Sequence, residues 1–421
     1  MEEAGEIAVV LPPQGGDWTP STTFVAGLSV FARVILAAER AGVRRFFILS
    51  GASSYALQKL LEGSKAEVFW VDARSSSESV EALRDIHAPL FFLNAATLFD
   101  PAVLRKAAEA FGNDVEILIP QPPTIALASP QILPPFLQAI EQKRLLDWGD
   151  FLALSRSYKT EAFDLPNGAL YLNASSLPIH EVEKRLYRSL GKSTDTALIR
   201  LARKASIPFV KRLAKTSATP NHVTLAGFLI GLGAIGLFLK VEYGSVLAGA
   251  LLFALSFVVD LADGMLARLK FLESRKGAWL DFVLDNVLHL GVFASLIRVV
   301  SVRSPGGHIF YLGGLLIGGS LLSAIAFGGY LRMLKGRRQI ASLIQHPTSN
   351  IQHRLERLVE AIRHRDFSLV LLLAALFDRV EWFLLAAAIG ANLFWPMVLY
   401  LLMSKRSAFS HQRSASKDIS L

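Results

Sequence analysis

The chain contains 421 residues, of which 52% are hydrophobic and only 19% are charged. That composition is too apolar for an ordinary soluble protein of this length. The formal net charge of +9 could indicate a nucleic-acid-binding protein, but the basic residues gather beside long apolar stretches. In that position they orient a membrane protein and contact anionic headgroups, so no nucleic-acid partner is expected. The chain has no cysteine, which excludes disulfides and thiolate metal sites.

Residues 1–180 have the pattern of an α/β domain, because short apolar runs alternate with helical stretches such as residues 28–41. This order of elements predicts a parallel sheet covered by helices. The predicted strands begin at Ile7, Arg45, Ala66, Pro89 and Val115.

This domain faintly resembles the sugar-phosphate nucleotidyltransferases. Residues 27–49 are similar to the helix and strand that follow the nucleotide loop, and residues 94–104 to the region around the metal site. A loop that cradles triphosphate needs glycines and a basic residue. Here residues 12–21 read PPQGGDWTPS, without Lys or Arg, and Asn94 stands where a metal-binding aspartate is expected. The domain is therefore predicted to be an inactive, scaffold or regulatory domain, with a working cytidylyltransferase as the alternative.

Residues 181–218 form a predicted juxtamembrane linker in which apolar residues lie amid basic ones. The pattern indicates an amphipathic segment on the cytoplasmic leaflet, which Pro208 is expected to break or kink. Arg200 and Arg203, with Arg332 further along the chain, could bind a phosphorylated acceptor or only contact headgroups. The apolar residues are Leu198, Ile199, Leu201, Ile207, Phe209, Val210 and Leu213.

Residues 219–403 contain apolar runs near the length of about 20 residues that crosses a bilayer. The last run, residues 367–403, is too long for one helix and is interrupted by charged residues from Asp378 to Glu381, so it is interpreted as two spans. A membrane domain made entirely of helices, with six transmembrane helices, is predicted. The other four runs lie near residues 222–240, 244–267, 278–299 and 308–331.

The basic residues orient these spans. The segments on one side hold 22 Lys and Arg residues and the turns on the other side hold 4. The basic side is expected to be cytoplasmic. Since no charged-then-apolar signal peptide precedes it, the N-terminal domain is expected on the same side, as is the basic tail of residues 404–421. The sequence thus predicts a multi-pass protein of the cell membrane.

Four aspartates lie inside two of the predicted spans, where a carboxylate is costly. The spacings Asp260–Asp263 (i,i+3) and Asp281–Asp285 (i,i+4) put each pair on one helix face. The short connection between the two helices makes them antiparallel neighbours, so all four carboxylates lie at a similar depth. Such a cluster needs cations, and Mg²⁺ or Mn²⁺ suits an all-oxygen site. Two such ions can clamp phosphate oxygens, whereas a cation-transport or proton-relay site is the alternative.

The whole pattern resembles the signature of the CDP-alcohol phosphotransferases, membrane enzymes of six helices that make phospholipids. It reads Asp260-x2-Asp263-Gly264-x2-Ala267-Arg268-x8-Gly277-x3-Asp281-x3-Asp285, and residues 219–224, TPNHVT, resemble the usual entry into the first helix of that family.

The resemblance implies a role for each of these residues. Asp260, Asp263 and Asp281 would hold divalent metal, with Asp285 as the general base and a second-metal ligand. The small and basic residues of the signature would shape the CDP pocket; these are Gly264, Ala267, Arg268 and Gly277.

The resemblance also implies the reaction and the partners. An alcohol hydroxyl would attack the β-phosphorus of a CDP-linked lipid or other CDP-alcohol and release CMP. The closest similarity is to members that use an inositol phosphate acceptor and carry a fused nucleotidyltransferase-like domain; Asp195 and Arg200 fall where those have a recurring Asp and Arg. A small alcohol acceptor, the lipid bilayer and a second copy in a homodimer are the expected partners. The identities of the acceptor and of the donor remain open.

Overall fold

The computed structural model describes residues 5–49, 54–61, 64, 66–71, 78–112, 114–142, 147–191, 195–337 and 367–418. The chain divides into two compact units. One consists of Met1–Gly191 with the short segments Ala214–Thr216 and Leu269–Phe271, and we call it the α/β unit. The other holds the remaining residues, and we call it the helical unit. The prediction of an α/β part followed by a helical part is confirmed.

The α/β unit is built on a seven-stranded sheet of order β10-β8-β9-β6-β1-β4-β5. Most neighbours run parallel, as predicted, but β9 pairs antiparallel with both β6 and β8, which the sequence did not predict. The connection from β8 to β9 is too short for the crossover that parallel strands require, and it therefore returns as a hairpin. The strands are β1 (Ile7–Leu11), β4 (Arg45–Leu49), β5 (Glu67–Val71), β6 (Leu90–Asn94), β8 (Ile117–Ile119), β9 (Ile125–Ala128) and β10 (Thr160–Ala162).

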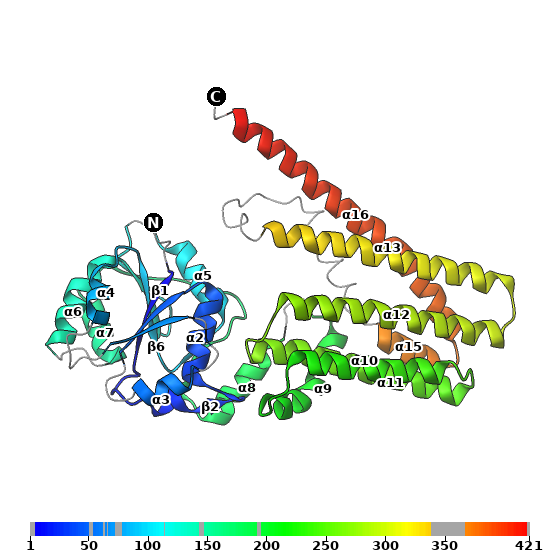
Figure 1. The fold of residues 1–421 in the computed structure, drawn as a ribbon, viewed down its shortest axis with the longest axis horizontal. Coiled ribbons are helices and arrows are strands. Elements are labelled where there is room, and N and C mark those ends of the chain that lie inside the picture. Colours follow the sequence, from blue (N-terminus) through cyan, green and yellow to red (C-terminus); the bar gives the residue numbers. More distant parts are fainter. Residues whose placement is uncertain are drawn as a thin grey trace. The chain divides into compact units, whose positions relative to one another are not determined.

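Helices cover both faces of this sheet (Figure 1). In β1, Ile7 and Val9 pack into the core on one face, while Ala8 and Val10 pack into the core on the other. This alternation is the period of two that a strand buried on both sides presents. Helices α2 (Val30–Ala41), α3 (Ser54–Lys59) and α5 (Pro101–Ala110) contribute to one core, and α4 (Glu78–Arg84), α6 (Leu133–Glu141) and α7 (Trp148–Ser155) to the other.

Shorter elements complete the α/β unit. Two small antiparallel pairs, β2 with β3 and β7 with β11, lie outside the main sheet. The remaining elements are α1 (Thr19–Thr22), β2 (Phe24–Val25), β3 (Leu28–Ser29), β7 (Thr97–Phe99), β11 (Tyr171–Asn173) and α8 (Ile179–Ser189), with short 3-10 turns at Pro130–Ile132 and Ala174–Ser176.

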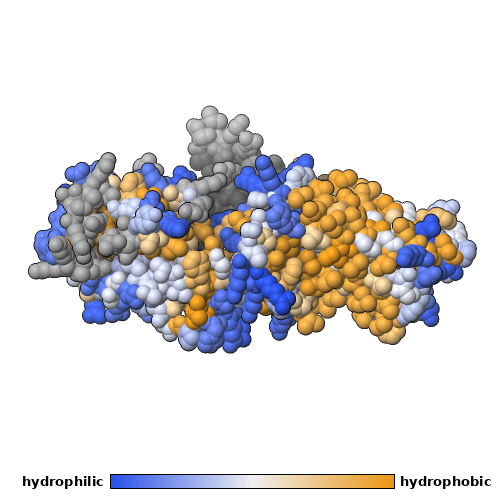
Figure 2. Space-filling view, turned by 60° about the horizontal axis from the view of Figure 1, so that its bottom comes forward, coloured by the Kyte–Doolittle hydropathy of each residue, from blue (hydrophilic) through white to orange (hydrophobic). Residues whose placement is uncertain are grey.

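The helical unit contains five helices that are long and apolar enough to cross a membrane. Large apolar side chains such as Leu229, Leu251 and Ile325 are exposed on these helices, and Figure 2 shows apolar residues over much of their surface. Surfaces of this kind suit lipid rather than water. The five are α10 (Pro220–Phe238), α11 (Tyr243–Leu269), α12 (Arg275–Arg303), α13 (Gly307–Arg337) and α16 (Val380–Asp418); α9 (Ala197–Ala214) precedes them and α15 (Phe367–Leu376) has only ten residues.

Helix α9 continues through Pro208, so the expected break does not occur. One side of α9 is buried, with Ile199, Ser206 and Val210. Pro208 is exposed, and so is Lys204, the residue whose backbone carbonyl has no N–H partner at position 208. A carbonyl on an exposed helix face can bond to water, which lowers the cost of an interior proline.

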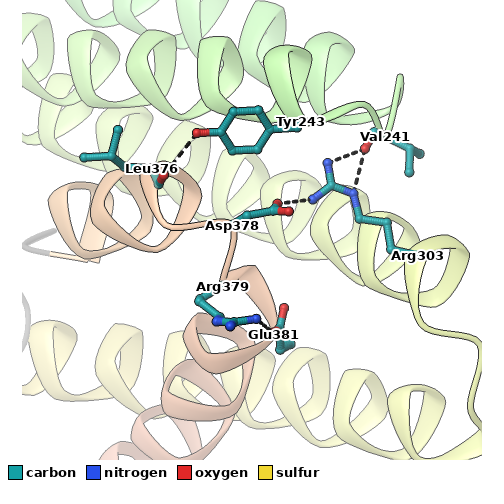
Figure 3. A network of polar contacts seen from close by, with 7 residues as sticks. All are labelled: Val241, Tyr243, Arg303, Leu376, Asp378, Arg379 and Glu381. Atoms are coloured by element: carbon teal, nitrogen blue, oxygen red, sulfur yellow. Dashed lines mark hydrogen bonds and ion pairs between the residues drawn. The ribbon is translucent and has the colours of Figure 1, made fainter.

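A polar network joins three turns at the α12 C-terminal end of the bundle (Figure 3). The Arg303 guanidinium donates to the Val241 carbonyl from Nε at 2.8 Å and from Nη2 at 2.5 Å, and its Nη1 donates to Asp378 Oδ1 at 2.6 Å. Tyr243 Oη donates to the Leu376 carbonyl at 3.0 Å. One arginine thus connects the α10–α11 turn, the end of α12 and the α15–α16 turn.

Candidate active site

Helices α11 and α12 carry the four aspartates predicted to form the site. The connection between them is short, and Ser274 caps α12 by accepting a hydrogen bond from the Gly277 backbone N–H at 2.9 Å. A serine at this position satisfies one of the N–H groups that a helix start leaves without a partner. The cap fixes where α12 begins, and with it the turn of the helix on which Asp281 lies.

Three of the aspartates come together. Carboxylate oxygens of Asp260, Asp281 and Asp285 all lie within 4.8 Å of one another, and each of these residues is half-buried. Three negative charges at this separation repel strongly unless a cation or protons neutralise them. An all-oxygen donor set of this size fits a hard divalent ion.

Asp263 has a partner on another helix. Only 8% of the residue is exposed, and its Oδ2 accepts a hydrogen bond from Thr224 Oγ1 on α10 at 2.5 Å. The sequence pattern predicted one cluster of four carboxylates; the structure brings three of them within 4.8 Å of one another and gives Asp263 a hydrogen bond to α10.

The small residues of the predicted pocket have different surroundings. Gly264 is exposed, and a Cβ there would meet nothing within 4 Å, so there is open space beside Asp263. At Gly277 a Cβ would lie 2.9 Å from Ser274 Oγ and 3.0 Å from Asn221 Oδ1. Gly277 therefore permits the close approach of the α10 and α12 N-termini, a packing role that the sequence alone did not reveal.

The arginines predicted to bind phosphate groups also differ in their surroundings. Arg268 and Ala267 are half-buried, and Arg268 Nε has no hydrogen-bond partner among the described residues. Arg203 forms a buried two-point ion pair with Asp195, with N–O distances of 2.5 and 3.0 Å. Arg200 is exposed, and the Arg332 guanidinium carbon lies 5.7 Å from the ring centre of Trp279.

Residues 217–331, which include all four aspartates, match the family model described as CDP-alcohol phosphatidyltransferase. This part of the chain is therefore similar to the CDP-alcohol phosphatidyltransferases. The TPNHVT segment and both aspartate helices lie inside the matched range, so the resemblance seen in the sequence is confirmed.

Two curated relatives match part of the chain. A bifunctional IPC transferase and DIPP synthase of Thermococcus kodakarensis is 31% identical over 140 residues, which are 33% of this chain and 30% of the relative. An archaetidylinositol phosphate synthase of Methanothermobacter thermautotrophicus is 35% identical over 80 residues, 19% of this chain and 40% of the relative. The chain thus matches less than half the length of either protein.

Among solved structures, the inositol-1-phosphate CTP transferase from T. maritima aligns over 44% of this chain and 96% of its own chain. The identity is 15% and the TM-score 0.33.

Outside the matched range, the glycine loop of the α/β unit already has an acidic partner. The Gly15 backbone N–H donates to Asp147 Oδ2 at 2.6 Å, and Asp147 Oδ1 accepts from the Asp150 N–H at the start of α7. Asn94 is buried, and its Oδ1 accepts from the Ala96 N–H at 2.9 Å. A loop amide that binds a carboxylate is not available to a phosphate, and this amide oxygen is already used within its own turn.

The sequence did not indicate the contacts of Asp147 and Thr224. Asp147 is 132 positions from Gly15, and no local pattern connects them. Thr224 lies within the quoted TPNHVT segment, but its position four residues after Pro220 gives no sign of a contact with Asp263 on another helix.

Proposed function

We propose that the chain is an integral membrane CDP-alcohol phosphotransferase, which transfers a phosphatidyl-type group from a CDP-linked lipid to an alcohol acceptor with release of CMP. The observation that carries this proposal is the convergence of Asp260, Asp281 and Asp285 within 4.8 Å between apolar helices of the matched range. Carboxylates are rarely placed at such depth without a functional reason.

The four aspartates are proposed to hold two ions of Mg²⁺ or Mn²⁺. Asp260, Asp263 and Asp281 would be metal ligands, and Asp285 would be the general base and a ligand of the second ion. Bound divalent metal supplies positive charge that neutralises the diphosphate and the departing CMP. Gly264, whose Cβ position is open, would let the donor approach the α11 backbone.

The remaining steps belong to groups of this chain. The Asp285 carboxylate would accept the proton of the acceptor hydroxyl. The oxygen of that hydroxyl would form a bond to the β-phosphorus, while the bond between this phosphorus and CMP breaks. Ala267, Arg268 and Gly277 would shape the CDP pocket. The half-buried Arg268 guanidinium offers a donor for a phosphate oxygen.

The proposed arrangement in the membrane has six spans, with α15 as the short fifth span beside the five long helices. We place residues 1–180 and the tail of residues 404–421 in the cytoplasm, with residues 181–218 as the juxtamembrane linker and 219–403 as the membrane domain. The distribution of basic residues supports this orientation. A homodimer is proposed as the working assembly.

An inositol phosphate is the proposed acceptor class, because one partial relative is named an archaetidylinositol phosphate synthase. The α/β unit is proposed to be an inactive or scaffold domain, as the Gly15–Asp147 hydrogen bond supports. A second candidate is a bifunctional enzyme whose α/β unit makes the CDP-alcohol, which the name of the Thermococcus relative favours.

The test is CMP release by the purified full chain with Mg²⁺ or Mn²⁺. CDP-diacylglycerol, an ether-lipid analogue and CDP-inositol serve as donors, with inositol phosphate, glycerol phosphate and lipid alcohols as acceptors. Metal-dependent release that requires one acceptor is expected, and Asp285→Asn should lower its rate by about 10²–10⁴-fold. Asp164→Asn, a change at an exposed carboxylate of the α/β unit, is the matched control and should retain the rate.

The opposite outcome would be a folded protein that releases no CMP with any pair of substrates. Metal-ion flux into vesicles by that same protein would favour the cation-transport alternative.

A further inference from the structure

Thr224 lies on the second turn of α10 and is almost completely buried, with 7% of the residue exposed. Its Oγ1 lies 2.5 Å from Asp263 Oδ2 on α11 and 3.1 Å from the Pro220 carbonyl of its own helix. Asp263 is equally buried, at 8%. The contact is therefore largely shielded from solvent.

The hydroxyl has one proton and two neighbouring acceptors. An ionised carboxylate and a backbone carbonyl can only accept, so Thr224 can donate fully to one of them at a time. The shorter distance is to Asp263, and hydrogen bonds to charged acceptors are the stronger class. The Thr224 proton is therefore directed at Asp263 Oδ2 whenever that carboxylate is ionised.

We propose that Thr224 is a positioning residue that fixes the Asp263 carboxylate for cation binding, which makes α10 a third helix of the metal centre; this inference rests on the proposed function. Asp263 lies one turn from Asp260 on α11, and its side chain could otherwise rotate away from the group of three. A hydrogen bond to one oxygen of a ligating carboxylate orients the group, and such outer contacts influence metal affinity strongly.

The same pair of helices contains a second contact that serves as a control. Ser256 Oγ on α11 donates to the Gly227 carbonyl on α10 at 2.8 Å and is also buried. Interhelical hydroxyl contacts of this kind contribute to helix packing in membranes. If Thr224 acted only through packing, removal of the Ser256 hydroxyl should have the same consequences, since both contacts join α10 to α11.

The experiment measures Mn²⁺ binding by the signal of free Mn²⁺ in electron paramagnetic resonance, on the full chain in detergent. Thr224→Val keeps the shape and removes the hydroxyl, Thr224→Ser restores it, and Ser256→Ala removes the control hydroxyl. We expect the Kd for Mn²⁺ to rise by about 10–100-fold in Thr224→Val, to return close to the wild-type value in Thr224→Ser, and to change by less than about twofold in Ser256→Ala.

Thermal melting of each variant checks the fold, and Thr224→Ala replaces Thr224→Val should the valine variant fail to fold. Wild-type affinity in the valine or alanine variant would overturn the inference, as would an equal loss of affinity in Ser256→Ala. CMP release is measured separately on the wild type. Absence of that release refutes the proposed function, whereas unchanged Mn²⁺ affinity in a wild-type-like fold refutes the positioning role alone.

Discussion

The two units each contain a place where the sequence pattern points to phosphate chemistry, and they differ in what their carboxylates face. In the helical unit, Asp260, Asp281 and Asp285 face one another within 4.8 Å. In the α/β unit, Asp147 faces the Gly15 amide and bonds to it at 2.6 Å. The first arrangement concentrates negative charge and favours a cation, whereas the second uses the charge to close a loop.

This difference shows why a carboxylate cannot be assigned a role from its residue type alone. The N–H groups of a glycine loop can bind any anion. A carboxylate of the same chain binds without the entropy cost of association, whereas a phosphate must bind from solution. Asp147 also caps α7, so its position is fixed by a structural contact. The α/β unit can therefore keep its fold while this loop N–H is unavailable to a nucleotide.

The largest expected effect tests this comparison directly, through one charge-removing substitution in each place. Asp281→Asn should lower the rate of CMP release by at least about 10²-fold, because it removes a charge that the proposed metal centre requires. Asp147→Asn should leave that rate within about twofold of the wild type, since asparagine also caps helices well. Initial rates at saturating Mg²⁺ provide the measurement.

The same preparations can be supplied with CTP and inositol 1-phosphate, and pyrophosphate release followed. None is expected from the wild type. Pyrophosphate release, or a loss of CMP release in Asp147→Asn, would show that the α/β unit takes part in the chemistry and would favour the bifunctional alternative.

The next effect concerns an arginine inside the α/β unit. Only 3% of Arg33 is exposed, and its guanidinium donates to the carbonyls of Val25 and Ala26, at 2.8–3.1 Å, and of Leu269 at 2.7 Å. Burial lowers the pKa of Arg33 to about 10, so the group stays charged at neutral pH and depends on these carbonyls. Arg33→Leu should destabilise the unit by about 3 kcal/mol, because buried carbonyls lose their donor.

Hydrogen–deuterium exchange of residues 24–41 is the appropriate measurement, since a two-unit chain does not have one unfolding free energy. The matched control is Arg40→Leu on the same helix, where the side chain is exposed and donates to the Phe271 carbonyl at 2.7 Å. Exchange that rises as much in Arg40→Leu as in Arg33→Leu would mean that burial of the guanidinium contributes little.

Much of the fold could be predicted from the sequence because its signals are local. The strand runs that begin at Ile7 and Arg45 and the apolar length of α10 to α12 depend on residues within one element. The antiparallel strand β9, IALA, was missed because four consecutive buried residues carry no alternation. The break expected at Pro208 is absent although its local rule is strong, because the proline lies on the exposed side of a helix that continues through it.

The site was predicted to the extent that it depends on helix periodicity. The spacing of three and four residues correctly indicated that Asp281 and Asp285 share a face and meet Asp260. The hydrogen bond from Thr224 to Asp263 joins residues 39 positions apart on two different helices. Contacts of that kind arise only when the helices pack, and no spacing rule applies to them.

The smallest effect returns to the comparison of the two units through their arginines. Arg303 resembles Arg33 in donating to main-chain carbonyls, but 26% of its side chain is exposed and its partner Asp378 is 54% exposed. Because both side chains are partly exposed, water can replace part of what the Arg303 guanidinium supplies. Arg303→Gln should therefore destabilise the helical unit by about 1–2 kcal/mol, less than Arg33→Leu destabilises the α/β unit.

The melting of the helical unit alone measures this loss, followed in detergent by hydrogen–deuterium exchange of α10 to α16 during heating, with Arg379→Gln as the control. Arg379 Nη1 lies 3.9 Å from Glu381 Oε1, with 67% and 46% of the two side chains exposed. A pair so open to solvent contributes at most about 1 kcal/mol, and the control should melt close to the wild type.

Val241 gives a reason for a larger effect at Arg303. Its φ of 68° is strained for a β-branched residue, and the Arg303 guanidinium donates to its carbonyl. If both variants melt together, the Val241 turn is held by packing and Arg303 is a surface residue like Arg379.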